Sequence, residues 1–185
     1  MMYHLSSLLK NEKLKLSPET KHGLEYKYAL YNVLSNDFEK FCELYSSNDY
    51  VEKIEDLLGW RKGKLFCECI FEYVRRKYRD KNLFSRIESF YLSKSLDDIN
   101  EFKQYSNRTG ITFEVNVDVS SCQKYDMNIF TLAETYLAKH DEITKDVFDA
   151  CCNYAEQYWN EETTDNPRYE YLYYGNISLK PIKQK

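Results

Sequence analysis

Apolar residues in the first part of the chain recur at the spacing of a helix. Within residues 24–45 they fall mostly three or four positions apart, which predicts a long amphipathic helix. The same pattern predicts a shorter helix over 49–60 and, after a break at Gly63, another over 64–79. We therefore expect a helical block over about residues 19–80.

Strand patterns precede and follow this block. Residues 2–7 form a short run of strand-compatible residues, and 89–93 is an apolar run bounded by serines that predicts a buried strand. Ser95 and Asp98 then have the spacing of a capping box, which predicts the start of a short helix. The cleanest alternation of apolar and polar residues, at 111–117, predicts another strand.

Two helices and two more strands complete the pattern. The helices are predicted around 128–137 and 144–159. After them, two tyrosine-rich apolar runs within 168–182 flank Gly175-Asn176, a dipeptide suited to a tight β-hairpin turn. The predicted order is a short strand, a helical block, and then strands separated by helices. This order predicts an α+β fold in a single domain of 185 residues.

The composition is that of a globular protein. Hydrophobic residues make up 43% of the chain, and 18 tyrosines carry much of the apolar area, so many buried hydroxyl groups need hydrogen-bond partners. The net charge of -4 gives no general attraction for nucleic acid or for an anionic membrane surface. Neither a membrane-spanning run nor a signal-peptide pattern is found, so we expect a soluble, cytoplasmic protein.

The cysteines and histidines do not form a metal-binding pattern. None of the six cysteines has the C-x-x-C spacing of a zinc site, and the three histidines are scattered. We expect reduced thiols, mostly in helices, and no metal.

Three separated segments carry the candidate chemistry: Tyr3-His4-Leu5-Ser6, Phe90-Tyr91-Leu92-Ser93 ahead of the capped helix, and Glu170 in a tyrosine-rich run. In this order they resemble the motifs of the ADP-ribosyltransferase superfamily. Arg86 is similar to an arginine that precedes the second motif in some bacterial and phage members. The resemblance spans the full chain, although the helical block is long for a minimal member. It implies an ADP-ribosyltransferase-like mixed β core with the helical block inserted after the first strand.

The resemblance also implies an NAD-dependent enzyme that transfers ADP-ribose to a macromolecule, of the kind used as toxins, effectors or phage proteins. Cleavage of the nicotinamide–ribose bond passes through an oxocarbenium-like state, which a carboxylate stabilises. By the resemblance, Glu170 is this catalytic carboxylate, and His4 donates a hydrogen bond to a ribose hydroxyl. Tyr91 or Phe90 stacks on the cationic nicotinamide ring.

The same resemblance implies the remaining NAD-binding residues. Ser6, Ser89 or Ser93 fixes the amide or the ribose, and Arg86 pairs with the pyrophosphate through two hydrogen bonds. Arginine-modifying members usually carry Glu or Gln two residues before the catalytic glutamate, where this chain has Arg168. Modification of arginine is therefore disfavoured, and the target stays open among other amino acids, nucleic-acid bases and small molecules.

Each candidate residue also has a structural interpretation. Glu170 could lie on the solvent face of an alternating strand, and a backbone carbonyl could satisfy His4. Phe90-Tyr91-Leu92 could simply be core, and Arg86 could pair with Glu88.

Two other functions fit the sequence. The same fold could bind NAD or another nucleotide without catalysis. Alternatively, the helical block could present a partner surface at a basic cluster, although cations at a helix C-terminus also complement the helix dipole. This cluster comprises Arg75, Arg76, Lys77 and Arg79.

Overall fold

The structure is a computed structural model, and it describes residues 1–6, 12–18, 62–78, 80–106 and 109–182. Within these residues the protein has a mixed α+β fold of four α-helices and two antiparallel sheets, which confirms the predicted class. None of the described helices is long and apolar enough to cross a membrane. The helices predicted over 24–45 and 49–60 lie outside the described residues.

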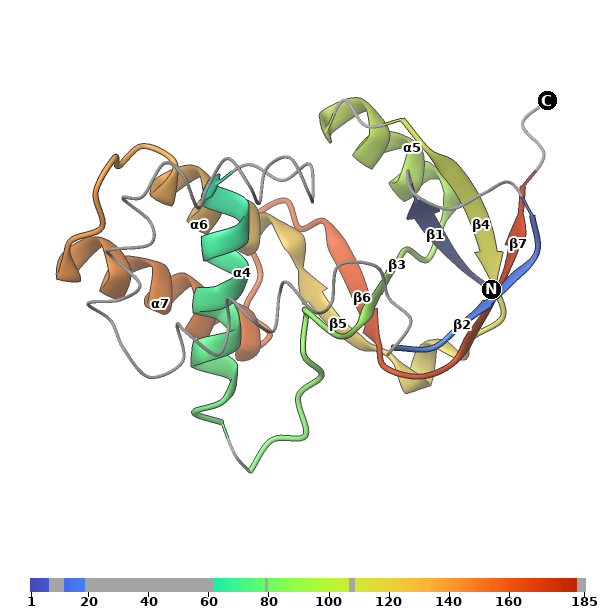
Figure 1. Ribbon diagram of the computed structural model, residues 1–185, viewed down its shortest axis with the longest axis horizontal. Helices are drawn as coiled ribbons and strands as arrows, with labels where there is room; N and C mark the ends of the chain where they lie inside the picture. Colours follow the sequence, from blue (N-terminus) through green and yellow to red (C-terminus); the bar gives the residue numbers. More distant parts are fainter. Residues whose placement is uncertain (7–11, 19–61, 79, 107–108, 183–185) are drawn as a thin grey trace.

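The strands form one sheet of four and one of three (Figure 1). The four-stranded sheet has the order β1 (Met2–Ser6), β4 (Ile111–Val115), β7 (Ile177–Pro181) and β2 (Leu14–Leu16). The three-stranded sheet has the order β3 (Phe90–Leu92), β6 (Tyr169–Tyr173) and β5 (Gln123–Asp126). An antiparallel bridge between Tyr3 and Ser93 joins β1 to β3, with an N–O distance of 2.8 Å in both directions.

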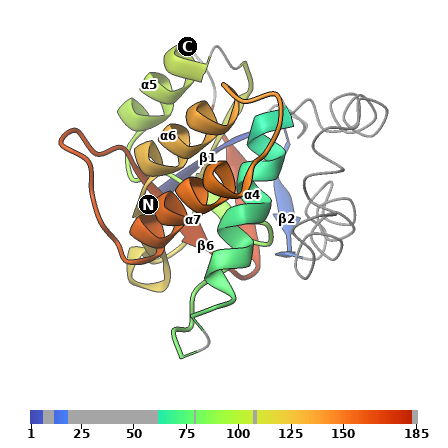
Figure 2. The same cartoon turned by 90° about the vertical axis from the view of Figure 1, so that its left-hand side faces the viewer.

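Three helices form a layer on the three-stranded sheet. The helices α4 (Lys62–Arg75), α6 (Met127–Leu137) and α7 (Lys145–Trp159) pack against one another. They lie on the side of the three-stranded sheet that is remote from the four-stranded sheet (Figures 1 and 2). The helix α5 (Leu96–Ser106) lies apart from them, beside β1.

The three-stranded sheet therefore lies between two apolar cores. On the helix side, Tyr125 and Leu172 pack with the buried faces of α4, α6 and α7. On the other side, Phe90, Leu92 and Tyr171 pack with residues of the four-stranded sheet. Neighbouring residues of β6 thus enter opposite cores, as the alternation of side chains along a strand requires.

Local signals explain where the helices start. Ser95 and Asp98 form the predicted capping box, in which the Asp98 N–H donates to Ser95 Oγ (3.1 Å) and the Ser95 N–H donates to Asp98 Oδ2 (3.2 Å). Asp126 caps α6 and Thr144 caps α7, each through a side-chain oxygen. Three predicted strands are confirmed: 2–7 as β1, 89–93 as β3 and 111–117 as β4.

The predicted hairpin within 168–182 is wrong. Both of its strands exist, but β6 lies between β3 and β5, whereas β7 lies between β4 and β2. A tight hairpin turn of the expected type needs a positive φ, and neither Gly175 nor Asn176 has one. Gly175 instead gives room to Tyr173, whose hydroxyl oxygen would lie 2.7 Å from a Cβ at this position. The chain here passes from one sheet to the other.

Other differences concern the bounds of elements. The helix α4 begins at Lys62 and includes Gly63, rather than starting after it, and it ends at Arg75, before its predicted end. A Cβ added at Gly63 would lie 3.4 Å from the Cβ of Ala138, an ordinary van der Waals contact, so the helix does not require glycine at this position. The sequence pattern predicts neither β2 nor β5, because both are short and β5 is largely polar.

Candidate functional site

The segments that carry the candidate residues are neighbours in space. The strand β1 carries His4 and Ser6, and the bridge described above joins it to β3. The strand β3 pairs in turn with β6, where Tyr91 lies opposite Leu172, two residues along the strand from Glu170. The order β1–β3–β6 therefore brings together segments from opposite ends of the chain.

Glu170 faces the helices rather than solvent. The residue is 6% exposed, so its interpretation as a solvent-face residue is wrong. Its Oε1 accepts hydrogen bonds from Nη1 of Arg86 and from the hydroxyl of Tyr158, the latter at 2.9 Å. Arg86 precedes β3 and Tyr158 belongs to α7, so two separate parts of the fold fix this carboxylate.

Arg86 lies at the centre of a buried ion-pair network. It is 3% exposed and contacts two carboxylates: Glu170 through Nη1, and Glu68 of α4 through Nε (2.9 Å) and Nη2 (3.3 Å). Its carboxylate partners are thus Glu68 and Glu170 rather than Glu88. Because two carboxylates share one guanidinium, the three side chains carry one net negative charge when all are ionised.

Two tyrosine hydroxyls complete the network. Tyr158 accepts a hydrogen bond from Arg86 Nη1 (2.6 Å) and donates to Glu170. Tyr91 donates to the backbone carbonyl of Arg86 (2.7 Å), and its hydroxyl lies 3.3 Å from Oε1 of Glu68. We call these five residues, Glu68, Arg86, Tyr91, Tyr158 and Glu170, the Arg86 network.

Aromatic rings enclose the guanidinium of Arg86. Its Cζ lies 4.1 Å from the ring centre of Phe130, 5.0 Å from that of Tyr158 and 5.2 Å from that of Tyr91. All three distances fall within the range of cation–π attraction. The rings also keep water away, which strengthens every charge interaction inside the network.

Packing determines the protonation states of the network. Burial lowers the pKa of the Arg86 guanidinium, but Glu170 and Glu68 raise it by more, so that it lies well above its ordinary value. Burial, and then the charge of Glu68, raises the pKa of Tyr91. Burial also raises the pKa of Tyr158, although Arg86 lowers it. Arg86 therefore stays charged, and both tyrosines keep the hydroxyl hydrogens that they donate.

His4 lies at the junction of the two sheets, where its side chain contacts β3. Its Nδ1 is 2.9 Å from the backbone oxygen of Tyr91, and its ring meets Phe90 edge-on at 6.3 Å between ring centres. A backbone carbonyl therefore engages His4, as in its structural interpretation. If the neutral ring donates from Nδ1 to this carbonyl, Nε2 is the nitrogen that accepts a hydrogen bond.

The remaining candidates differ in exposure. Ser6 and Ser93 are partly exposed, whereas Ser89 and Phe90 are 0% and 2% exposed. Phe90 belongs to the core between the two sheets, on the opposite side of β3 from the Arg86 network. Its interpretation as a core residue is therefore confirmed.

The family of the chain follows from comparison with known sequences. Residues 3–184 match the family described as "Protein of unknown function (DUF2441)". The chain belongs to the DUF2441 family. No curated protein matches it. What this DUF2441 protein does must therefore be argued from the geometry of its site.

Two residues of the Arg86 network are not among the candidates predicted from the sequence. Glu68 lies in α4 in a polar stripe with Lys64, Glu72 and Arg75, which recur three or four residues apart, and the apolar residues occupy the rest of the helix surface. Such a stripe is typical of a solvent-exposed face, so the sequence pattern gives no signal that Glu68 is buried. Tyr158 is predicted on the inward face of α7, but no local pattern indicates that it bonds Glu170.

The basic cluster at the end of α4 is partly engaged within the protein. Arg75 contacts Glu72 through Nε (2.9 Å) and Nη2 (2.7 Å), and Nε of Arg76 lies 3.4 Å from the same carboxylate. Lys77 is exposed, and Arg79 lies outside the described residues. Arg75 is thus turned toward the protein rather than toward a partner.

Arg168, two residues before Glu170, is directed toward α6. Its Nε donates to the side-chain oxygen of Asn128 (2.5 Å), and Nη2 donates to the hydroxyl of Thr131 (3.4 Å). The position therefore presents a cation that already has partners in the protein.

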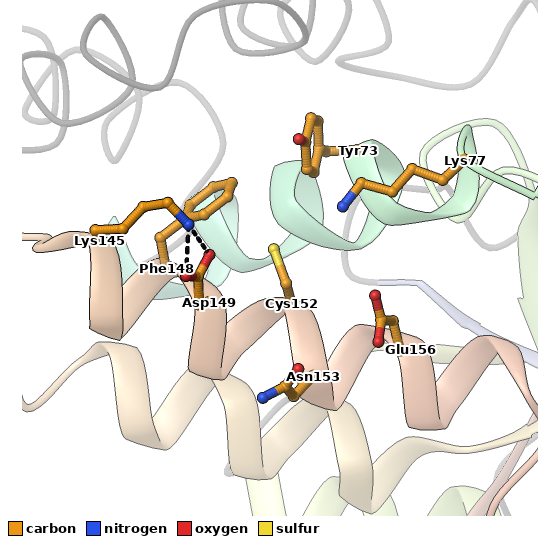
Figure 3. A pocket seen from close by; sticks show the side chains of 8 residues that line it. All are labelled: Tyr73, Lys77, Lys145, Phe148, Asp149, Cys152, Asn153 and Glu156. Carbon is orange, nitrogen blue, oxygen red and sulfur yellow. Dashed lines mark hydrogen bonds and ion pairs between the residues drawn. The ribbon is translucent and has the colours of Figure 1, made fainter.

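Two surface pockets lie away from the Arg86 network. One, of about 430 Å³, lies between α4 and α7, where Tyr73 and Lys77 face Phe148 and Cys152 (Figure 3). Lys145 and Asp149 form an ion pair at its margin (Figure 3). The other, of about 350 Å³, is lined by β5 and the residue before it, by Glu161 and Thr163, and by Tyr169 at the start of β6. Neither pocket is lined by a residue of the Arg86 network.

The Arg86 network can stabilise positive charge. Its carboxylates are fixed in advance by hydrogen bonds, lie in a water-poor environment and carry one more charge than the guanidinium neutralises. Fixed charges of this kind act strongly on a cation that develops nearby during a reaction.

Proposed function

We propose that this DUF2441 protein is an NAD-dependent ADP-ribosyltransferase that acts in the cytoplasm on a macromolecule. The observation that supports the proposal is the adjacency of β1, β3 and β6, the three strands whose residues resemble the superfamily motifs. Of the motif residues, Tyr91 and Glu170 are distant in sequence and meet at a buried charged cluster, and such clusters are typical of functional sites. An ADP-ribosyltransferase-like β core, with the helical block inserted after β1 and β2, is part of the same proposal.

In the proposed reaction, the bond between ribose C1′ and the nicotinamide nitrogen breaks. Its electron pair leaves with nicotinamide, which becomes neutral, and C1′ becomes cationic. A nucleophile of the target then bonds to C1′ and loses a proton. Glu170 lowers the barrier because its negative charge stabilises the cationic transition state.

The direct roles belong to Glu170, His4, Tyr91 and one of two partly exposed serines. Both hydrogen bonds described for Glu170 use Oε1, so Oε2 is the oxygen that a ribose hydroxyl would approach. His4 accepts a hydrogen bond from a ribose hydroxyl through Nε2, rather than donating one. Tyr91 offers its ring to the cationic nicotinamide, and Ser6 or Ser93 supplies a hydroxyl for its amide or the ribose.

Three buried residues take supporting roles. To bind the pyrophosphate, Arg86 would have to leave both Glu68 and Glu170, so in the proposal it holds the catalytic carboxylate instead. Ser89 and Phe90 support β3 from within the fold, which leaves Tyr91 as the stacking residue. The target is not an arginine side chain, because Arg168 stands where the acidic or amide side chain of arginine-modifying members would be.

The test is a titration with NAD followed by an assay of nicotinamide release, on wild type and Glu170→Gln in parallel. We expect both proteins to bind NAD and only wild type to release nicotinamide at an appreciable rate. Equal release by the two proteins, or no NAD binding by wild type, would overturn the proposal.

A second candidate function is the binding of NAD or another nucleotide without catalysis. The ion pair of Glu170 with Arg86, and the 7% exposure of the Glu170 side chain, favour it, because a paired carboxylate interacts less with substrate. Binding of NAD without release by either protein would support this alternative. A third outcome would indicate a protein-interaction module. In that case wild type does not bind NAD, and charge reversal at Arg76 and Lys77 abolishes binding to a protein partner.

A further inference from the structure

Glu68 has a position in the network that the proposed reaction does not explain. It comes from α4, outside the strands that carry the motif residues, and it is 3% exposed. It contacts Arg86 through two guanidinium nitrogens, Nε and Nη2, whereas Glu170 contacts Nη1. The two carboxylates thus hold the same cation from different sides.

Such an arrangement divides one positive charge between two negative ones. If Glu68 were absent, Arg86 could turn to meet Glu170 with two nitrogens, which is the preferred geometry of an arginine–carboxylate pair. The charge of Glu170 would then be largely cancelled. With Glu68 on Nε and Nη2, that geometry is blocked, and Glu170 keeps part of its charge for a cationic partner.

We propose that Glu68 is a positioning residue that shares Arg86 with Glu170 and so prevents the guanidinium from neutralising the catalytic carboxylate. The inference rests on the proposed function, but the sharing of Arg86 can be measured without it. Glu72 provides a matched control. It lies one turn further along α4, it is also 3% exposed, and it pairs with Arg75 instead of Arg86.

The first experiment is a double-mutant cycle on stability, with Glu68→Gln, Glu170→Gln and the double variant unfolded in urea. Each single variant leaves one carboxylate to neutralise Arg86, whereas the double variant leaves a buried cation with none. We therefore expect the double variant to lose more stability than the two single losses combined. Failure of the double variant to fold counts as the same result only where the two single losses together are smaller than the free energy of unfolding of wild type.

Two outcomes of the cycle would overturn the inference. Losses that add, or a single variant as unstable as the double, would show that the carboxylates do not share the guanidinium. The cycle of Glu72→Gln with Glu170→Gln should be additive, because Glu72 has its own arginine. The same more-than-additive loss in this control cycle would also overturn the inference.

The second experiment measures nicotinamide release at increasing NAD concentration. We expect Glu68→Gln to lower kcat by about 10- to 100-fold, the size typical of residues that orient a reacting group, with little change in KM. Glu72→Gln should change neither beyond its effect on the folded fraction. Equal kcat values for these two variants would reject the role of Glu68 and leave the proposed function intact. No release by wild type would instead reject the proposed function, while the stability cycle would still decide whether Arg86 is shared.

Discussion

Both faces of the three-stranded sheet bury apolar side chains, but the face toward the helices also buries an ion pair. The face toward the four-stranded sheet packs Phe90, Leu92 and Tyr171 into an apolar core. The face toward the helices buries Glu170 and holds it in an ion pair with Arg86. The same short strands supply both faces, so the contrast comes from the side chains and not from the backbone.

This contrast indicates which face serves chemistry. A buried ion pair is weak support for a fold, because taking two charges out of water costs about as much as their attraction returns. Apolar residues of similar volume would join the sheet to the helices at least as well. A guanidinium buried between two carboxylates therefore points to a functional demand on the helix-facing side.

The largest effect on stability is expected from Arg86→Met. The variant leaves Glu68 and Glu170 buried without a cation, and breaking a buried pair in this way typically costs about 3–5 kcal/mol. Urea unfolding measures the loss against Lys180→Met, whose exposed pair with Glu114 contributes at most about 1 kcal/mol. Equal losses in the two variants would show that the helix-facing charges do not depend on Arg86.

A triple replacement sharpens this result. In Glu68→Met/Arg86→Met/Glu170→Leu no charge is left without a partner, but the buried Tyr158 hydroxyl loses both of its partners, so we expect the free energy of unfolding to return to within about 1–3 kcal/mol of wild type. Nicotinamide release should stay absent. A triple variant as unstable as Arg86→Met would mean that the network stabilises the fold. The buried ion pair would then no longer indicate a functional demand on the helix-facing side.

A somewhat smaller loss is expected on the apolar face from Leu179→Ala. Leu179 lies on β7 and is 2% exposed within the core between the sheets, so its truncation should cost about 2–5 kcal/mol. At a temperature where the variant remains folded, nicotinamide release per folded molecule should stay close to that of wild type. Selective loss of release in this variant would show that the apolar face also serves the reaction.

The smallest of these losses is expected at Asp126, a buried carboxylate held by neutral donors instead of a cation. It accepts hydrogen bonds from the N–H groups of Asn128 (2.9 Å), Thr164 (2.8 Å) and Arg168 (3.0 Å), and from the Thr164 hydroxyl (2.7 Å). Burial raises the pKa of Asp126, but these hydrogen bonds, those of Thr164 first, lower it by more, so the net shift is downward. We expect Asp126→Asn to cost about 1–3 kcal/mol at neutral pH.

The lowered pKa also determines how this loss depends on pH. A carboxylate with a lowered pKa in the folded state contributes its full stability above the ordinary value of about 3.9, and loses it as the pH falls through the folded-state pKa. The difference in unfolding free energy between wild type and Asp126→Asn should therefore be constant above about pH 5 and shrink below about pH 4. A difference that grows toward acid pH would contradict the assignment.

Local sequence patterns were sufficient for most elements but not for their pairing. Alternation at β4 and the capping box of Ser95 and Asp98 are short-range features, and both are present in the structure. Pairing depends on all the strands at once. The two runs around Gly175-Asn176 look like a hairpin because they are adjacent, but each has two other strands as partners.

The candidate site shows the same limit. The resemblance points to His4, Tyr91 and Glu170, and the order of the strands makes their segments neighbours. It does not point to Glu68, because this carboxylate comes from a helix and meets Arg86 only through tertiary packing. A buried partner of this kind is set by the whole fold and leaves no local motif.

The most direct test of the proposed function is the rate of nicotinamide release from NAD by wild type, Glu170→Gln and Glu114→Gln, compared at equal folded fraction. Glu114 is a matched control because it is a strand glutamate, on β4, that pairs with Lys180 at the surface. We expect Glu170→Gln to be slower than wild type by about 100-fold or more, and Glu114→Gln to match wild type. Release by Glu170→Gln at the rate of Glu114→Gln would contradict the assignment of Glu170 as the catalytic carboxylate.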